Sequence, residues 1–280
     1  MIILLAVAIG VVVLLAGNWI AALTSVNLAH GTSVPWAIVP IALWLWVYWQ
    51  FLDGKFGADF DPATRRSNLR ANRVPAALWI PSLAAGLLGF AALLAGLSLA
   101  ARLVEFPAGT PITTPPEMPV ITVVLLLTMQ SIMAGVTEEA AFRGYMQSLI
   151  ERQHGLLVAI VVNGIVFGLL HFSSHPGAVL QMLPYYVAVA AVYGGLTWAA
   201  DSILPAIVLH SAGDVVVLIR WWATGRPEWQ LSATPSPLVS QTGIDAGFVT
   251  TLLMAIVLGA LTILSYRKVR ALRVAAREAA

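Results

Sequence analysis

Long apolar stretches, separated by shorter polar segments, run through the whole chain. Eight of them approach the roughly 20 apolar residues that a helix needs to cross a bilayer. They span residues 2–23, 34–52, 76–104, 120–150, 156–171, 178–200, 203–222 and 246–266. This pattern predicts an all-α, polytopic transmembrane helix bundle of about eight spans.

The composition supports a membrane protein and excludes several other classes. Of the 280 residues 59% are hydrophobic and 10% are charged, whereas a soluble domain carries about 25% charged residues. The chain has no cysteine, which excludes disulfides and thiolate chemistry. No folded polar domain displays the basic residues, so we expect no nucleic-acid partner. We predict a single membrane domain, residues 1–280, whose motif-bearing core covers about 119–222.

Basic residues predict the orientation, because short cytoplasmic loops are enriched in Lys and Arg. With eight spans, eleven basic residues fall on the side of the N-terminus and three on the other. The eleven are Lys55, Arg65, Arg66, Arg70, Arg73, Arg152, Arg267, Lys268, Arg270, Arg273 and Arg277. We therefore expect an integral protein of a bacterial cell membrane, with both termini in the cytoplasm.

Two adjacent glutamates and an arginine follow an apolar run at membrane depth. Each ionisable group there costs roughly 2.5–3.5 kcal/mol, so such groups are rare and indicate function. Glu139 and Arg143 are spaced i,i+4 and share one helix face, whereas Glu138 lies about 140° from Arg143. The spacing predicts an ion pair of Glu139 with Arg143 and leaves Glu138 as a candidate general base. The alternative is a solvated helix end from which Arg143 snorkels to water.

Two histidines belong to later apolar runs. His171 shares a helix face with Asn163 and Phe167, and His210 is spaced i,i+4 from Asp214. Histidines inside a bundle can be purely structural and hydrogen-bond to a neighbouring helix. In straight spans His171 and His210 lie at different depths, so they meet only if helices are offset or broken.

Three short motifs in this order resemble the type II CAAX prenyl endopeptidase and bacteriocin-processing (CPBP, or Abi) family. They are Glu-Glu-Ala-Ala-Phe-Arg at 138–143, Phe-Gly-Leu-Leu-His at 167–171 and His-Ser-Ala-Gly-Asp at 210–214. The resemblance implies an intramembrane protease in which Glu138, assisted by His171, activates water. It further implies that His210 and residue 214 stabilise the oxyanion and that Glu139 and Arg143 form a supporting ion pair.

Position 214 departs from the family, which usually has asparagine there. An amide donates hydrogen bonds to an oxyanion, whereas a carboxylate does so only when protonated. We therefore expect Asp214 to orient His210, although the resemblance favours the donor role.

The sequence does not decide whether the protein binds a metal cofactor. Glu138, His171 and His210 are candidate ligands for a divalent metal such as zinc, but the HExxH arrangement of many zinc proteases is absent. His171 and His175 form a second candidate pair at i,i+4. Because Pro176 follows at once, we interpret His175 as a helix-end residue.

These observations predict an endopeptidase that acts on a protein or peptide substrate within the lipid bilayer. A non-catalytic membrane scaffold or immunity-type protein is the main alternative, and the aspartate at position 214 favours it slightly. A transporter is a third hypothesis, since intramembrane acids and histidines also build proton relays. No inverted repeat is visible to support transport.

Overall fold

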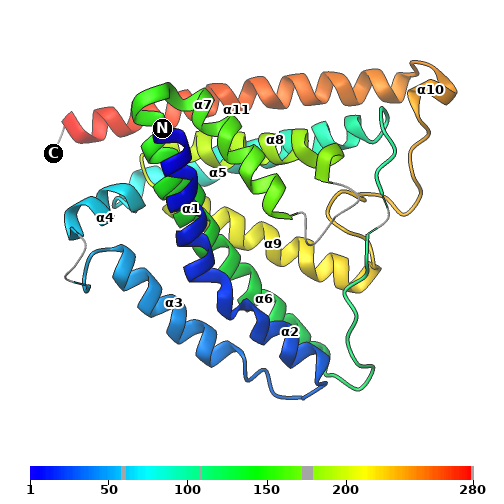
Figure 1. Ribbon diagram of the computed structural model, residues 1–280. Coiled ribbons are helices and arrows are strands. Elements are labelled where there is room, and N and C mark those ends of the chain that lie inside the picture. Colours follow the sequence, from blue (N-terminus) through cyan, green and yellow to red (C-terminus); the bar gives the residue numbers. More distant parts are fainter. Residues whose placement is uncertain (58–60, 108, 172–178, 279–280) are drawn as a thin grey trace.

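The computed structural model describes residues 1–57, 61–107, 109–171 and 179–278, and this part of the chain contains helices and no strands (Figure 1). The all-α prediction is confirmed. The helices are α1 (Ile2–Asn18), η1 (Trp19–Ala21), α2 (Ala22–Ala29), α3 (Ile38–Leu52), α4 (Pro62–Leu69), α5 (Ala76–Ala100), α6 (Val120–Glu138), η2 (Glu139–Met146), α7 (Gln147–Leu170), α8 (Val179–Ala200), α9 (Leu204–Thr224), α10 (Val239–Thr242) and α11 (Ala246–Glu278).

Several helices are long and apolar enough to cross a membrane, so the protein is an integral membrane protein. Within the described residues there are five: Ile2–Ala29, Ala76–Ala100, Val120–Leu170, Leu204–Thr224 and Ala246–Glu278. The predicted count of about eight is not confirmed. One reason is α3, whose 15 residues extend only about 22 Å, less than the ~30 Å hydrocarbon core.

The helix that begins at Val120 passes through three stretches of backbone. It is α-helical to Glu138, continues as the π-helix η2 and becomes α-helical again in α7. Gly155 then adopts φ 80°, a conformation that glycine reaches without a Cβ clash, and α7 turns back along the bundle (Figure 1). Two predicted spans, 120–150 and 156–171, thus belong to one 51-residue helical segment, Val120–Leu170.

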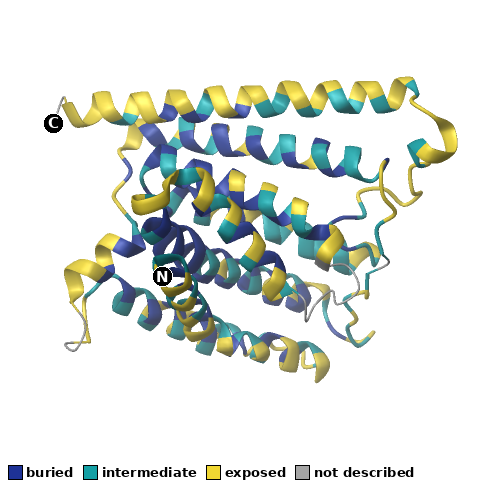
Figure 2. Cartoon of the chain, turned by 45° about the horizontal axis from the view of Figure 1, so that its top comes forward, coloured by how far each residue is buried: buried dark blue, intermediate teal, exposed yellow. Residues whose placement is uncertain are grey.

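The core of the bundle surrounds η2. α1 crosses α6 and η2 on one side, α9 packs along α6, and α8 packs along α7 (Figure 1). Buried residues therefore concentrate at the crossing, as the dark blue ribbon in Figure 2 shows. Phe142 and Met146 of η2 belong to the same hydrophobic cluster as Ala6 of α1 and Leu196 of α8.

The basic segments lie toward one end of the bundle. The two termini, α4 and the bend within α7 are all found there (Figure 1). Asp201 accepts hydrogen bonds from Arg70 at 3.0 Å and from Arg277 at 2.6 Å, which tie the polar segment 53–72 and the C-terminal tail to the start of α9. The tail continues α11 as a helix to Glu278. Which side of the membrane this end faces stays a prediction.

Candidate active site

α6 and α9 approach each other closely one turn before the two glutamates. A Cβ built on Gly135 would lie 2.2 Å from Ser211 Oγ and 2.9 Å from Ser211 N, so only glycine allows this contact. Ser211 follows His210 directly in the chain. The glycine thus lets α9 place His210 beside the end of α6.

His210 is the centre of the polar cluster. Its Nδ1 lies 2.7 Å from Glu139 Oε1, while its Nε2 lies 3.6 Å from both Glu138 Oε2 and Asp214 Oδ2. An ionised carboxylate only accepts hydrogen bonds, so Nδ1 carries the proton toward Glu139. The Tyr193 ring stacks on the imidazole with centroids 4.8 Å apart. Nε2 is therefore the nitrogen available for chemistry, and it faces two carboxylates.

Glu139 and Arg143 form the predicted ion pair. Arg143 Nη1 lies 3.1 Å from Glu139 Oε1, and the side chains are 1% and 0% exposed. The guanidinium also lies 5.3 Å from the ring centroids of Phe167 and Tyr193, within the range of cation–π attraction. One carboxylate oxygen thus contacts both His210 and Arg143, so the pair holds His210 in place and leaves no solvated helix end here.

The π-helix changes the angular argument made from the sequence. That argument used α-helical geometry and directed Glu138 away from the face of Glu139. Residues Glu139–Met146 instead form the wider π-helix, a form often found at functional sites. Both glutamates consequently reach His210, Glu139 at Nδ1 and Glu138 at Nε2.

Glu139 also contacts His210, so Asp214 is not alone in holding this side chain, and its orienting role stays a prediction. Glu139 has a hydrogen bond of 2.7 Å to Nδ1, whereas Asp214 stands 3.6 Å from Nε2. The Glu139 contact is tertiary, since this partner comes from η2 and not from the same helix turn. The Asp214 and Glu138 side chains are 33% and 16% exposed while Glu139 is fully buried. Glu138 and Asp214 are therefore more exposed than Glu139 within this cluster.

His171 lies near this cluster without joining it. Its Nδ1 is 2.8 Å from the carbonyl oxygen of Phe167; a carbonyl only accepts, so Nδ1 carries the hydrogen and Nε2 keeps its lone pair. The ring stacks on Tyr186 at 4.8 Å, and it lies within electrostatic reach of Asp214. In the described part of the chain His171 forms no hydrogen bond or ion pair with Glu138 or His210. The second candidate histidine, His175, lies outside the described residues.

Glu228 is a further acid near the cluster that the sequence did not indicate. It follows α9 in a polar loop, and its Oε1 lies 3.4 Å from the hydroxyl of Tyr186. Burial raises the pKa of Glu228 to about 7, partly opposed by the nearby His171. The only signal in the sequence is an acid followed by tryptophan in a loop with few charges, which is too weak to predict a site.

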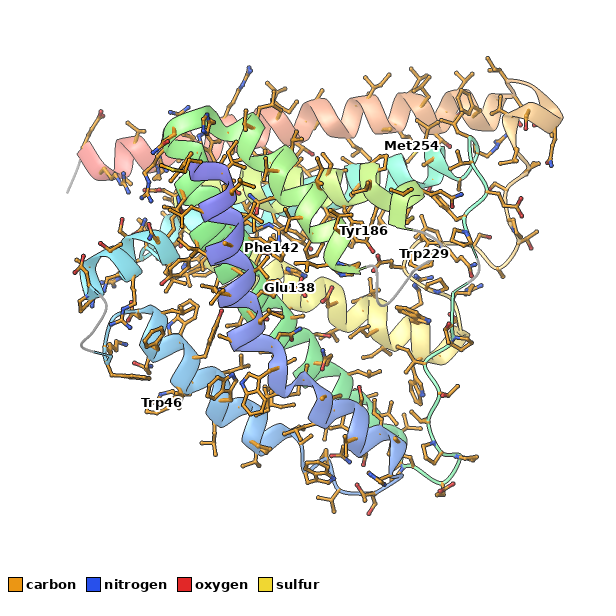
Figure 3. All side chains as sticks on the ribbon, in the orientation of Figure 1. Trp46, Glu138, Phe142, Tyr186, Trp229 and Met254 are labelled. Carbon is orange, nitrogen blue, oxygen red and sulfur yellow. The ribbon has the colours of Figure 1, made fainter. Side chains whose placement is uncertain are left out.

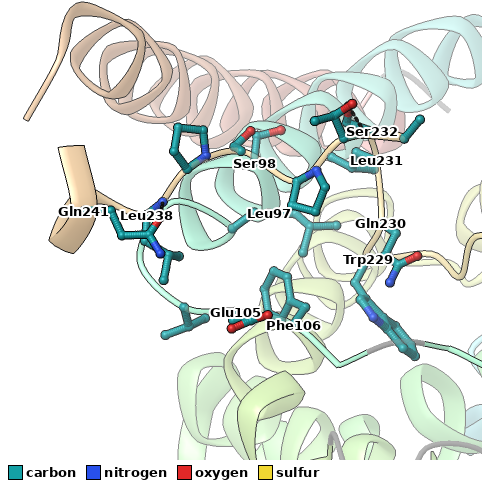
Figure 4. Close-up of a pocket in the computed structure, with 17 residues that line it drawn as sticks. Leu97, Ser98, Glu105, Phe106, Trp229, Gln230, Leu231, Ser232, Leu238 and Gln241 are labelled. Carbon is teal, nitrogen blue, oxygen red and sulfur yellow. Dashed lines mark hydrogen bonds between the residues drawn. The ribbon is translucent and has the colours of Figure 1, made fainter. Parts of the chain in front are cut away.

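The loop that carries Glu228 is anchored on both sides. Arg220 donates to the carbonyls of Pro227 and Gln230 at 2.9 and 2.8 Å, and the indole of Trp229 donates to the carbonyl of Pro107 at 2.8 Å. Trp229 also lines a pocket of about 500 Å³ together with Phe106 (Figure 4). In Figure 3 Tyr186 appears between Glu138 and Trp229.

The proposed metal ligands do not form a metal centre in this arrangement. Among the residues that the structure describes, no group of three His, Asp or Glu side chains is spaced to hold a metal ion. Nδ1 of His210 is already engaged by Glu139. The zinc hypothesis for Glu138, His171 and His210 is thus unsupported, and we derive no step through a metal.

Comparison with known families finds a match for the segment that builds this cluster. Residues 120–216 match the family model described as Type II CAAX prenyl endopeptidase Rce1-like. The resemblance inferred from the three motifs is confirmed over this segment. No curated protein and no solved structure matches the chain. The Rce1-like segment contains α6, η2, α7, α8 and most of α9, so it includes Glu138, Glu139, Arg143, His171, His210 and Asp214.

Proposed function

We propose that this protein is an intramembrane endopeptidase that hydrolyses a peptide bond of a membrane-associated protein or peptide, using water activated by Glu138. One observation carries the proposal. The partly exposed Glu138 carboxylate faces Nε2 of an imidazole whose other nitrogen is held by the buried Glu139. The Rce1-like segment supports the reaction class.

In the proposed reaction Glu138 is the general base. It takes a proton from water as the water oxygen bonds to the carbonyl carbon of the scissile peptide, and the carbonyl oxygen becomes an oxyanion. The same proton then passes to the amide nitrogen as the carbon–nitrogen bond breaks. One positioned acid–base group contributes typically 10²–10⁴-fold to a rate. His171 assists with its Nε2 lone pair.

His210 is assigned to the oxyanion. When its imidazole is protonated at both nitrogens, Nδ1 donates to Glu139 and Nε2 is free to donate to the developing negative charge. A donor placed in this way in a water-poor site stabilises the transition state without reorganisation. Arg143 and Glu139 are positioning residues, because they act through His210.

Asp214 has two roles compatible with its place beside Nε2. As a carboxylate it stabilises the imidazolium form of His210, whereas as a carboxylic acid it donates to the oxyanion itself. Its exposure of 33% allows contact with substrate in either role. We favour the first role, because the i,i+4 spacing holds the carboxylate against the ring.

Glu138→Gln provides the test, because it preserves shape and removes the base. Membranes of cells that produce the wild-type, Glu138→Gln or Glu117→Gln protein would be compared by proteomics for new peptide termini. Glu117, in the loop before α6, is the matched control. We expect cleavage products with the wild type and Glu117→Gln only.

Cleavage products that persist with Glu138→Gln would refute the mechanism. An unchanged proteome with all three proteins, together with an unchanged phenotype, would support the non-catalytic scaffold or immunity-type alternative. The aspartate at position 214 is the observation that favours this alternative.

A further inference from the structure

A second cavity lies on the outer side of the bundle, and its lining contains none of the charged or histidine residues of the three motifs. It has a volume of about 970 Å³ and runs between α5, α8 and α11, with the start of the returning part of α7 at one end. Its lining is almost entirely apolar, and no acidic residue lies among the described residues that form it. α11 forms one wall of the cavity, and most of this helix is exposed (Figure 2). We call this cavity the α11 groove.

The α11 groove is long and is open to an occupant. Along α8 its lining extends from Gln181 to Trp198, seventeen residue steps or about 26 Å. Gly96 of α5 and Gly259 of α11 both line it, and a Cβ built on either would meet no atom within 4 Å. Close packing between the helices therefore does not require glycine at either position.

The length and the lining of the groove indicate what kind of molecule fits. An occupant about 26 Å long would contact an almost entirely apolar surface. A hydrocarbon chain has this length and buries only apolar surface there.

The charge at one end of the groove determines the head group. Arg267 is the only charged residue in the lining, is exposed, and forms no ion pair within the described part of the chain. Arg270 stacks over Trp198 at 4.4 Å at the same end. The apolar part of α11, residues 246–266, is about 32 Å long, so Arg267 lies where the hydrocarbon core ends. Arg binds phosphate oxygens in a bidentate manner.

We propose that the α11 groove binds an anionic phospholipid, with an acyl chain along α5 and α8 and the phosphate at Arg267. The site is independent of the proposed peptidase, since none of its lining residues belongs to the polar cluster around His210. A zwitterionic phospholipid has the same chain but no net charge for Arg267 to attract, so the head group is the discriminating feature.

The test uses the full-length protein in detergent, titrated with phosphatidylglycerol or phosphatidylcholine of identical acyl chains and observed by native mass spectrometry. We expect the first bound lipid to be phosphatidylglycerol, with about tenfold tighter binding. Arg267→Ala should remove this preference, whereas Lys268→Ala, an exposed neighbour outside the lining, should keep it within about twofold.

Binding of the acyl chain is tested at Gly96 and Gly259. Gly96→Leu with Gly259→Leu fills the groove and should weaken both lipids about tenfold, while Gly96→Ala at the same place should not. Thermal melting verifies that each variant is folded, and Gly259→Leu alone replaces the double variant if that one is unstable.

Three results would overturn the proposal. The first is equal binding of both lipids to the wild type, and the second is unchanged binding in the folded leucine variant. The third is an equal effect of Arg267→Ala and Lys268→Ala, which would indicate general surface attraction. A dimer mass that disappears in the leucine variant would instead identify a second copy of this chain as the occupant.

Discussion

Arg143→Ala should destabilise the protein strongly, because it removes the cation beside the buried Glu139 carboxylate and leaves only the contact with His210. The Arg143 and Glu139 side chains are 1% and 0% exposed and lie 3.1 Å apart. Removing one partner of a buried pair costs ~3–5 kcal/mol. The loss also includes the contacts of the guanidinium with the rings of Phe167 and Tyr193, each worth up to about 2 kcal/mol when desolvated. We therefore expect a decrease in unfolding free energy near the upper end of that range.

The assay compares thermal melting of purified variants in one detergent. Glu138→Gln is the reference, because Glu138 is partly exposed and the amide keeps its shape. Within the described residues the ion-pair contact of Glu138 is the one with His210, at 3.6 Å. We expect the melting temperature to be highest for the wild type, lower for Glu138→Gln and lowest for Arg143→Ala. Arg143→Lys should fall between the last two, since it keeps the charge but loses the planar contact with the rings.

A double variant separates the pair from its surroundings. Glu139→Gln combined with Arg143→Met leaves no buried charge and should be more stable than Arg143→Ala alone. Equal melting shifts in Arg143→Ala and Glu138→Gln would refute the reasoning, because they would mean that the buried pair contributes no more than a partly exposed carboxylate.

Three further predictions concern catalysis, pH and topology. Asp214→Asn should lower turnover if the carboxylate stabilises the imidazolium; full activity in Asp214→Asn with loss in Asp214→Ala would support the donor role. The pKa of Glu228 is raised to about 7 by burial, so the folded state binds more protons than the unfolded state and stability should decrease as pH rises from about 4.5 to 7. Glu228→Gln should reduce the change in melting temperature between pH 5 and 8. An unchanged pH dependence in this variant would mean that other groups cause it. Reporters fused after Arg73 and Arg270 should both be cytoplasmic and one after Gly225 should not; opposite locations for the first two would invalidate the predicted topology.

Local features could be predicted from the sequence because they depend on neighbours within one helix. The apolar runs predicted the helices, since a lipid-exposed segment must satisfy its own backbone hydrogen bonds. The pairing of Glu139 with Arg143 followed from i,i+4 spacing, which places side chains together whatever the rest of the fold does. The three motifs likewise predicted the family relationship of residues 120–216.

Tertiary structure decided which of these residues meet. His210 reaches Glu139 because Gly135 lets α9 approach α6, and this long-range contact has no signature in either helix alone. The π-helix η2 and the return of the loop to Tyr186, which brings in Glu228, are similarly products of packing. The sequence by itself thus determined the helices and one ion pair, whereas packing between helices far apart in the chain determined the hydrogen bonds and exposed carboxylates of the candidate site.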